Sequence, residues 1–290
     1  MTVLKQDKNK SILWGSITDK IELAVMYIVL IVMAAAFIVP FYWLVVSSLK
    51  RPSEMFVVPV QWLPSEIQFD NYKNMFGMIP FFQYLKNTMV LVLNNVLGSL
   101  ISSSLVAYGF SRLRWKGRDQ VFVLVLISMI LPYMVTMIPL YLLFRDLGWL
   151  GTMAPLLVPL YFGNPFFIFL MRQFFSGLPH ELSEAARIDG AGEFRIYWQI
   201  CLPLAKPAMA TVAIFAFLRS WSDYIGPLIY LQDSSLYTLS IGVQLIRSNL
   251  DPKWAEMMAA GVVMVSPVLL LFFLLQKYFI QGIALSGIKG

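Results

Sequence analysis

Residues 184–204 read EAARIDGAGEFRIYWQICLPL, a polar and mostly helix-forming stretch in a chain that is otherwise apolar. Of the 290 residues, 59% are hydrophobic and only 13% are charged. Soluble domains carry about 25% charged residues, and a soluble core of this length cannot hide so much apolar surface. The composition therefore indicates a polytopic membrane protein in which one hydrophilic insertion separates two of the apolar runs.

Six apolar runs are long enough to cross a bilayer as helices, which takes about 20 residues each. They lie at residues 23–49, 85–110, 121–144, 152–170, 204–231 and 257–280. The fourth run is interrupted by Pro155, Pro159 and Pro165. We expect prolines to kink the helices around a cavity, namely Pro132, Pro139, Pro159 and Pro267. The pattern predicts an all-α fold of six transmembrane helices, with an N-terminal tail at residues 1–20 and one transmembrane domain at residues 21–290.

An even number of spans puts both termini on one side of the membrane, and the distribution of basic residues indicates which side that is. The termini, the RLRWKGRD loop at residues 112–119 and the region of the opening stretch hold about twice as many lysines and arginines as the opposite loops. Both termini are therefore predicted to be cytoplasmic. The net charge of +6 reflects these retained basic residues and does not indicate nucleic acid binding. Cys201 is the only cysteine, which excludes an intrachain disulfide.

The opening stretch follows the sequence SGLPHELS and is predicted to form two short helices. Pro179 suits the first turn of the first helix, and Gly190 suits its end, because glycine adopts the left-handed conformation freely. The helical spacing puts four side chains on one face of this helix: Leu182, Ala185, Ala186 and Asp189. A second helix is predicted at about residues 193–202, with an apolar face formed by Phe194, Tyr197, Trp198 and Cys201.

Two interpretations of this insertion remain open from the residues alone. A short helix on the cytoplasmic side can seat in the groove of a soluble partner. It can also lie at the membrane interface and pack only against its own bundle. Its charges roughly cancel, which argues against a basic helix that simply binds lipid.

The insertion also carries a longer motif, EAA-x(3)-G-x(9)-I-x-LP, at Glu184, Ala185, Ala186, Gly190, Ile200, Leu202 and Pro203. This motif resembles the signature loop of the permease subunits of bacterial ABC importers. The stretches NTMVLVLNN, LVAYGFSRLRWKGRD, SWSDYIGPLIYL and KYFIQGIALSGIKG resemble the carbohydrate-uptake group, in particular its maltose-type G subunit. The resemblance covers nearly the whole chain.

The resemblance implies a MetI-like permease fold with a cytoplasmic coupling helix between spans four and five, in a coupling loop at about residues 178–203. The coupling residues would be Glu184, Ala185, Ala186, Arg187, Asp189 and Gly190. Such a subunit sits in the bacterial cytoplasmic membrane and pairs with a second homologous permease, two cytoplasmic ATPase subunits and a solute-binding protein. It would be a transport subunit rather than an enzyme, with ATP and Mg held by the ATPase subunits. The chain has no G-x-x-x-x-G-K-[ST] phosphate loop of its own.

Polar residues within the spans are candidates for a solute pathway, because ionisable groups are costly in lipid. Aromatic and hydrogen-bonding side chains together suit a sugar. We therefore expect the pathway to be lined by Asn94, Ser220, Trp221, Ser222, Asp223 and Tyr224. Asp223 can instead pair with Arg219 four residues earlier as an internal brace. Asn95 and Asn164 are interpreted as links between helices.

Two other functions are compatible with parts of the sequence. An ion-coupled secondary transporter would use Asp223 as its proton or sodium site, and an ABC permease for a non-sugar solute would share the motif. No nucleophile–base constellation supports an enzyme. The lone His180 has no clustered ligands that would suggest a metal site.

Overall fold

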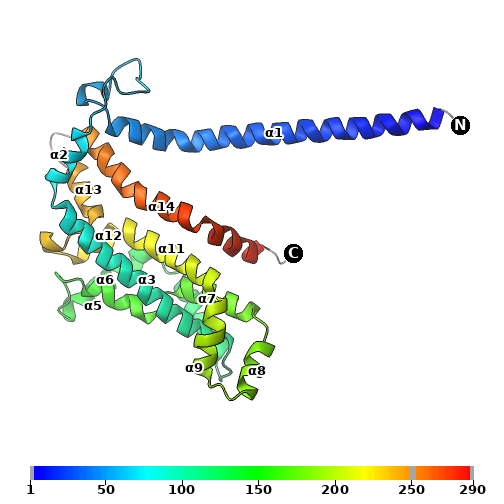
Figure 1. Ribbon diagram of the computed structural model, residues 1–290. Coiled ribbons are helices and arrows are strands. Elements are labelled where there is room, and N and C mark those ends of the chain that lie inside the picture. Colours follow the sequence, from blue (N-terminus) through cyan, green and yellow to red (C-terminus); the bar gives the residue numbers. More distant parts are fainter. Residues whose placement is uncertain (1–2, 248–252, 288–290) are drawn as a thin grey trace. The chain divides into compact units, whose positions relative to one another are not determined.

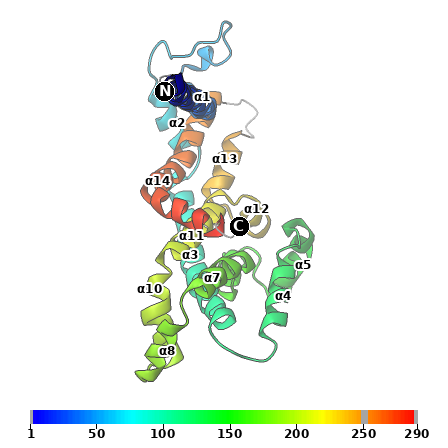
Figure 2. The same ribbon diagram turned by 90° about the vertical axis from the view of Figure 1, so that its right-hand side faces the viewer.

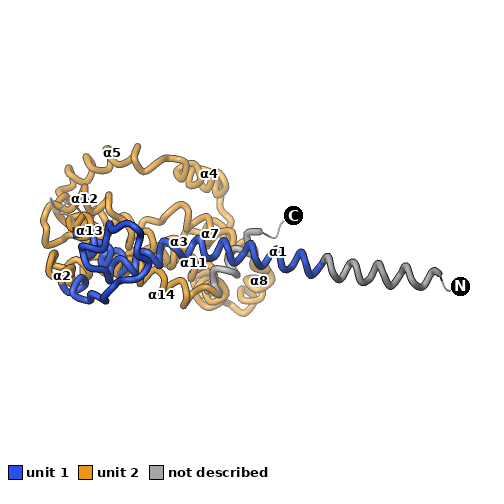
Figure 3. The backbone as a smooth tube through the Cα atoms, turned by 90° about the horizontal axis from the view of Figure 1, so that it is seen from above, with its two compact units in different colours: residues 1–73, 253–262 blue, residues 74–252, 263–290 orange. Residues whose placement is uncertain are grey.

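A computed structural model describes the backbone of residues 3–247 and 253–287 and the side chains of residues 19–247 and 253–276. Every regular element in these ranges is a helix, which confirms the all-α class. Several basic residues used to predict the topology lie outside the described side chains: Lys5, Lys8, Lys10, Lys277 and Lys289. The chain divides into two compact units, residues 1–73 with 253–262 and residues 74–252 with 263–290 (Figure 3).

The first unit contains α1 (Val3–Ser48), the short 3-10 helix η1 (Pro52–Glu54), the first residues of α2 (Asp70–Met78) and of α14 (Trp254–Gly287). The end of α1 is held by side chains that bond its terminal carbonyls. Asn71 donates to the carbonyls of Ser48 (2.9 Å) and Lys50 (2.8 Å). Lys50 itself is buried, with its ammonium 4.2 Å from the centre of the Trp43 ring. Polar groups therefore close this helix end, where four carbonyls have no partner within the helix.

The second unit is built around α3 (Phe81–Ser111), which packs against α7 (Pro165–Gly177) and α11 (Lys206–Ser222) (Figure 1). The helices α4 (Arg118–Ser128) and α5 (Tyr133–Asp146) follow α3 and are seen from the side in Figure 2. The remaining elements are short: α6 (Ala154–Leu157), η2 (Val158–Phe162), α8 (Glu181–Ile188), α9 (Glu193–Ile196), the π-helical turn η3 (Tyr197–Cys201), α10 (Leu202–Leu204), α12 (Ile225–Tyr230), η4 (Ser234–Leu236) and α13 (Leu239–Arg247).

Four helical stretches are long and apolar enough to span a membrane: Asp19–Ser48, Phe81–Ser111, Ala154–Gly177 and Trp254–Gln276. Two further spans are possible if bent helix pairs are counted, which gives up to 6 and agrees with the prediction. The pair Arg118–Ser128 with Tyr133–Asp146 is bent by 99°, and the pair Glu193–Leu204 with Lys206–Ser222 is bent by 78°.

Two of the predicted spans are not continuous helices. The third breaks at residues 129–132, as expected from Pro132, which takes an extended conformation before α5 because it cannot donate to a helix that would run through it. The fifth ends at Ser222, and Asp223 is extended (φ −68°, ψ 119°) before α12 begins. Hydropathy reports only that a segment is apolar, so the first break was signalled by the proline and not by the apolar run.

The fourth span is interrupted as its prolines predict. The 3-10 stretch η2 ends at Gly163 (φ +91°), and α7 then begins at Pro165. Asn164 is the residue before this helix, and its side-chain oxygen accepts hydrogen bonds from the backbone N–H groups of Phe166 (3.1 Å) and Phe167 (3.3 Å). Asn164 is therefore a helix cap. The interpretation of Asn164 as a link between helices was wrong.

Asn95, by contrast, does link helices. It is buried in α3, and its amide donates to the Ala216 carbonyl (2.9 Å) and to the Ser220 hydroxyl (2.6 Å), both in α11. Its side-chain oxygen accepts from Ser99 at 3.0 Å. The amide therefore pairs polar groups that have few alternative partners in an apolar interior.

We expect Asn95→Ala to destabilise the chain by about 1 kcal/mol, because it leaves the Ala216 carbonyl and the Ser220 hydroxyl without this donor. The single cysteine, Cys201, is buried, so its labelling by a thiol-reactive dye during heating reports unfolding. The variant should label at a lower temperature in detergent than the unmodified chain. Leu97→Ala, which truncates an exposed residue of the same helix, is the control. An equal shift in both variants would contradict the prediction.

Candidate functional site

The coupling segment, residues 178–203, lies at one end of the second unit and consists of α8 followed by α9, η3 and α10 (Figure 1). The first helix begins at Glu181, and two acidic residues in its first turn, Glu181 and Glu184, favour its positive N-terminal end. It stops before Gly190, whose φ of +79° is the left-handed conformation that the sequence predicted. A Cβ atom added at Gly190 would meet nothing within 4 Å, so the backbone conformation alone calls for glycine.

Most of the motif residues in α8 face outward. Glu184, Ala185, Arg187, Asp189 and Gly190 are exposed, whereas Ala186 is buried in the core of the unit. Of the predicted common face, Leu182, Ala185 and Asp189 are exposed together, whereas Ala186 lies on the buried side with Ser183. The most exposed apolar side chain of the helix is Ile188, at 87%.

The second half of the segment departs from the predicted helical face. Ile196, Tyr197 and Cys201 are buried, whereas Phe194 is 71% exposed and Trp198 is 59% exposed. Of the predicted apolar face, Tyr197 and Cys201 are therefore buried, whereas Phe194 and Trp198 are exposed. The π-helical turn Tyr197–Cys201, in which hydrogen bonds span five residues, was not predicted.

Polar bonds connect the coupling segment to α3. The Tyr108 hydroxyl donates to Glu193 Oε2 at 2.7 Å, and Arg187 Nε donates to Glu193 Oε1 at 2.8 Å. The bond with Glu193 raises the pKa of the Arg187 guanidinium further above its already high value, so this group stays charged. A separate bond of 2.7 Å joins the hydroxyls of Ser104 and Tyr197.

Arg112, at the end of α3, holds the start of the segment. Its guanidinium donates to the carbonyls of Phe175 (2.6 Å) and Leu178 (2.7 Å), and a longer contact of 3.4 Å reaches the Pro179 carbonyl. Arg112 is 7% exposed, so these bonds lie within the protein. Sequence reasoning treated Arg112 only as a basic residue that sets topology. Its partners lie more than 60 positions away along the chain, and no local pattern signals them.

The predicted pathway residues gather at the break between α11 and α12, but most of them have structural partners there. Asp223 Oδ1 accepts from the Gly226 N–H at 3.1 Å, and the Asp223 carbonyl accepts from Ser240 at 2.6 Å. No ion pair within 4.0 Å joins Asp223 to Arg219 among the described residues. The close ion pair of the brace alternative is therefore absent at this position, since α11 ends at Ser222 and the helical spacing does not reach Asp223.

The other pathway residues differ in their exposure. Trp221 is buried, stacks on Phe217 with ring centres 5.6 Å apart, and donates to the Met264 carbonyl in α14. Ser220 accepts from Asn95, as described above, whereas Ser222 is exposed and Tyr224 is half-buried. Asn94 lies on α3 and donates to the Val90 carbonyl, and its side-chain oxygen accepts from Tyr161 at 2.8 Å. Asn94 and the Asp223 region are on different helices, and no described bond joins them.

Side chains of α3 also fix the segment after α12, which the sequence did not suggest. Asn87 donates to the carbonyls of Ser235 (2.8 Å) and Tyr237 (2.9 Å). Thr88 accepts from the Leu239 N–H at 2.9 Å. The start of α13 is therefore attached to α3 by bonds between residues about 150 positions apart.

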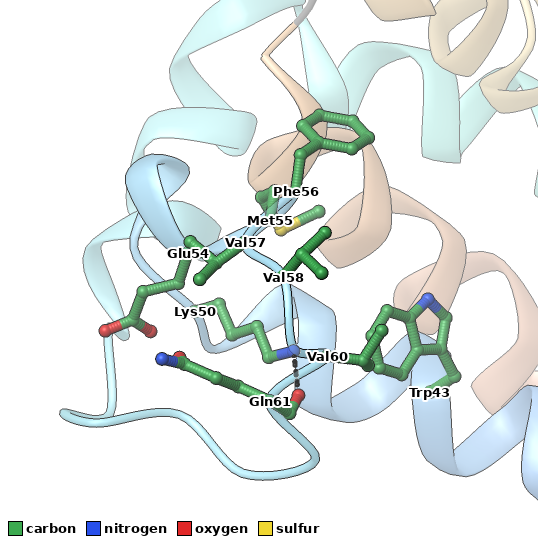
Figure 4. Close-up of a pocket in the computed structure, with 9 residues that line it drawn as sticks. All are labelled: Trp43, Lys50, Glu54, Met55, Phe56, Val57, Val58, Val60 and Gln61. Atoms are coloured by element: carbon green, nitrogen blue, oxygen red, sulfur yellow. Dashed lines mark hydrogen bonds between the residues drawn. The ribbon is translucent and has the colours of Figure 1, made fainter.

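Two cavities occur away from the pathway residues. One of about 200 Å³ lies in the first unit, between the end of α1 and the loop at residues 54–61, and Trp43 and Lys50 line it (Figure 4). The other, of about 220 Å³, lies between α3 and the coupling segment and is lined by Tyr108, Glu193 and Phe194 among others. In the described part of the chain, no three His, Cys, Asp or Glu side chains gather as metal ligands would.

A bundle of apolar helices with a short, outward-facing helix at one end is the architecture of a membrane transport component. Residues 95–285 match the family described as the binding-protein-dependent transport system inner membrane component, and the chain belongs to this family. The family description itself implies that a solute-binding protein works with the permease.

The relatives agree over almost the full length. The arabinooligosaccharides transport system permease protein AraQ of Bacillus subtilis (strain 168) is 35% identical over 257 residues, which are 88% of this chain and 91% of that protein. The lactose transport system permease protein LacG of Rhizobium radiobacter is 31% identical, covering 91% and 96%. A crystal structure of a bacterial ABC transporter involved in the import of alginate matches with a TM-score of 0.80 and 26% identity, covering 90% of this chain and 98% of that one.

The comparisons confirm the resemblance seen in the motif, the MetI-like permease fold and the role as a transport subunit rather than an enzyme. The chain is a multi-pass permease subunit of an ABC importer in the inner membrane. The alternative of a stand-alone, ion-coupled transporter is therefore set aside.

The turn at Gly190 can be tested with two glycines of the coupling segment. Gly190→Ala should destabilise the segment by about 1–2 kcal/mol, because an alanine is strained at φ +79°. Gly192→Ala is the matched control, since its φ of −73° suits any residue and a Cβ there also meets nothing within 4 Å. Labelling of the buried Cys201 thiol should speed up in Gly190→Ala alone, and Gly190→Asn should restore part of the protection. Equal labelling of both alanine variants would contradict this account.

Proposed function

We propose that the chain is a permease subunit of an ATP-driven importer that moves a sugar or oligosaccharide across the cytoplasmic membrane by alternating access. The observation that carries the proposal is the coupling segment, a short helix with exposed motif residues at one end of an apolar bundle. The sugar assignment is supported by relatives whose names give arabinooligosaccharides and lactose, and by the structural neighbour that imports alginate.

The exposed side of α8 is the surface that a cytoplasmic ATPase subunit would cover. Ile188 is 87% exposed and Leu182 is 42% exposed, and both would leave water on docking. The exposed Glu184 and Asp189 would supply polar contacts around them. ATP and Mg would be bound by two such ATPase subunits and not by this chain. Closure of the ATPase pair would then move the coupling helix.

The remaining assembly follows from the same interpretation. A second, homologous permease subunit would complete the pathway, and a solute-binding protein would deliver the sugar from outside. Both termini and the coupling segment would be cytoplasmic, with the whole of residues 21–290 acting as one transmembrane domain. This orientation is supported by the excess of basic residues at the termini and at residues 112–119.

For the solute pathway, we retain the residues at the break of span five as candidates, together with Asn94 on α3. Ser222 is exposed, and Asp223 and Tyr224 are half-buried, so these three can meet a solute. Trp221 and Ser220 would support these three residues and not contact the solute themselves. Their polar atoms already bond to the Met264 carbonyl and to Asn95, respectively. Broken helices that line a cavity are where a membrane protein tolerates such polar groups.

The experiment that tests this function uses the importer purified through an affinity tag on this chain and reconstituted in liposomes with its binding protein. Uptake of arabinooligosaccharides, galactooligosaccharides or lactose should require MgATP, whereas methionine should not be taken up. Ile188→Asp should lower both the retained ATPase and the uptake by about tenfold, because it places a charge on a surface that becomes buried. Ile188→Val keeps the apolar surface and should behave normally. Methionine uptake without sugar uptake would support a non-sugar solute instead.

The proposed role of Asp223 in the solute pathway can be separated from its role as a helix cap. Asp223→Asn keeps an oxygen that can accept from the Gly226 N–H, so we expect unchanged thermal stability but reduced sugar uptake. Asp223→Ala should also lose about 1 kcal/mol of stability with the cap. Asp233→Asn is the control, because Asp233 caps Ser235 in the same way and is not a pathway candidate. Full uptake by Asp223→Asn would leave the cap as the only role of this carboxylate.

A further inference from the structure

The coupling helix α8 is joined to the bundle by two short linkers, and neither linker is itself a regular helix. Residues 178–180 precede the helix and residues 189–192 follow it. The second linker contains Gly190 and Gly192, which lack the side chains that would pack and stiffen it. The helix also packs against the bundle through its buried side, which includes Ala186. The side-chain bonds from α3 add fixed directions to this packing, so they bear on how a movement of α8 reaches the transmembrane helices.

Each end of α8 is tied to α3 by a different side chain. At the start, Arg112 bonds the carbonyls of Phe175 and Leu178, which fixes the turn that leads into α8. At the end, Arg187 bonds Glu193, and Glu193 accepts the hydroxyl proton of Tyr108. Tyr108 and Arg112 are four residues apart at the end of α3 and so lie on one side of it.

We propose that Tyr108, Glu193 and Arg187 form a positioning relay that transmits displacement of the coupling helix to α3, with Arg112 as the fixed point of the turn. The proposal rests on the proposed function of α8 as the helix that an ATPase subunit moves. It assigns to these residues a part in the transport cycle that goes beyond holding the fold.

Directional bonds act beside apolar packing between α3 and the coupling segment. Ala186 of α8 lies in the same buried core as Tyr108 of α3, and an open pocket of about 220 Å³ lies beside Tyr108, Glu193 and Phe194. Packing holds the two elements together, and hydrogen bonds add a fixed direction. The Tyr108 hydroxyl bonds to a carboxylate, which is a stronger acceptor than a neutral oxygen. The side chains of the Arg187–Glu193 pair are about half exposed, so the pair adds little to the stability of the fold. Its role in the relay is to hold the two side chains in a fixed arrangement.

A second bond on α3 provides an internal comparison. Tyr197 and Ser104 also join the coupling segment to α3 through hydroxyls 2.7 Å apart, but this bond does not involve α8. Tyr108 and Tyr197 are both buried, at 5% and 4% exposed. Tyr108→Phe and Tyr197→Phe each remove one hydroxyl and keep the ring. The two variants differ in whether the lost bond lies on the route from α8 to α3.

The test compares these two variants in the reconstituted importer, with the panel sugar that the unmodified complex takes up. Both should lower the temperature of Cys201 labelling by a similar amount, because each loses one bond of similar length. Tyr108→Phe should keep its ATPase subunits and still hydrolyse ATP, but move about fivefold less sugar per ATP, as expected for the loss of one hydrogen bond. Tyr197→Phe should keep the unmodified ratio of sugar to ATP.

Further variants make the outcome decisive. Glu193→Ala, at an exposed position that does not endanger folding, should match Tyr108→Phe, and the double variant should be no worse than either single one because both interrupt the same relay. A normal sugar-to-ATP ratio in Tyr108→Phe, or an equal fall in Tyr197→Phe, would overturn the relay and leave the proposed function intact. If the unmodified complex takes up no sugar with ATP, the proposed function fails and the relay fails with it.

Discussion

The structure depends on one constraint, which is that backbone N–H and C=O groups in a bilayer must find partners within the protein. Helices satisfy it along their length, but this chain breaks its helices at several points. Side chains meet the need at two of these breaks: Asn164 caps α7, and Asp223 bonds the Gly226 N–H at the start of α12. Arg112 serves the carbonyls at the end of α7 in the same way. Polar residues in the spans thus serve the backbone first.

Because many polar side chains in the spans bond the backbone, only some parts of the site could be predicted from the sequence. The composition and the long apolar runs define an all-α membrane bundle, and the EAA motif identifies the permease family. Gly190 was also predictable, since a glycine after a short helix is a local signal and the structure places it at φ +79°. Polar residues near the pathway, by contrast, are ambiguous in sequence, because a cap, a link between helices and a solute contact all use the same residue types.

The elements that escaped prediction share a physical cause, which is that their partners are remote or their geometry is irregular. The bonds of Arg112, Asn87 and Thr88 cross more than 60 positions of the chain, and nothing in a local window marks them. The π-helical turn Tyr197–Cys201 is such an irregular element, because no local pattern in the sequence signals hydrogen bonds that span five residues. Phe194 and Trp198 belong to the predicted apolar face but are exposed, and the pattern does not tell a buried apolar side chain from an exposed one.

The same irregular turn has a consequence for the mechanics of the coupling segment. A π-helical turn bonds each carbonyl to a residue five positions on, so it is less favourable than an α-helical turn and persists only where other contacts hold it. Here the holding contacts are the burial of Ile196, Tyr197 and Cys201 and the bond from Tyr197 to Ser104. The segment is therefore anchored behind α8 by packing. The helix α8 contributes only Ser183 and Ala186 to the buried side and is otherwise connected through polar bonds at its two ends. Bonds of this kind can rearrange with less loss of packing than a change in the anchored part would require.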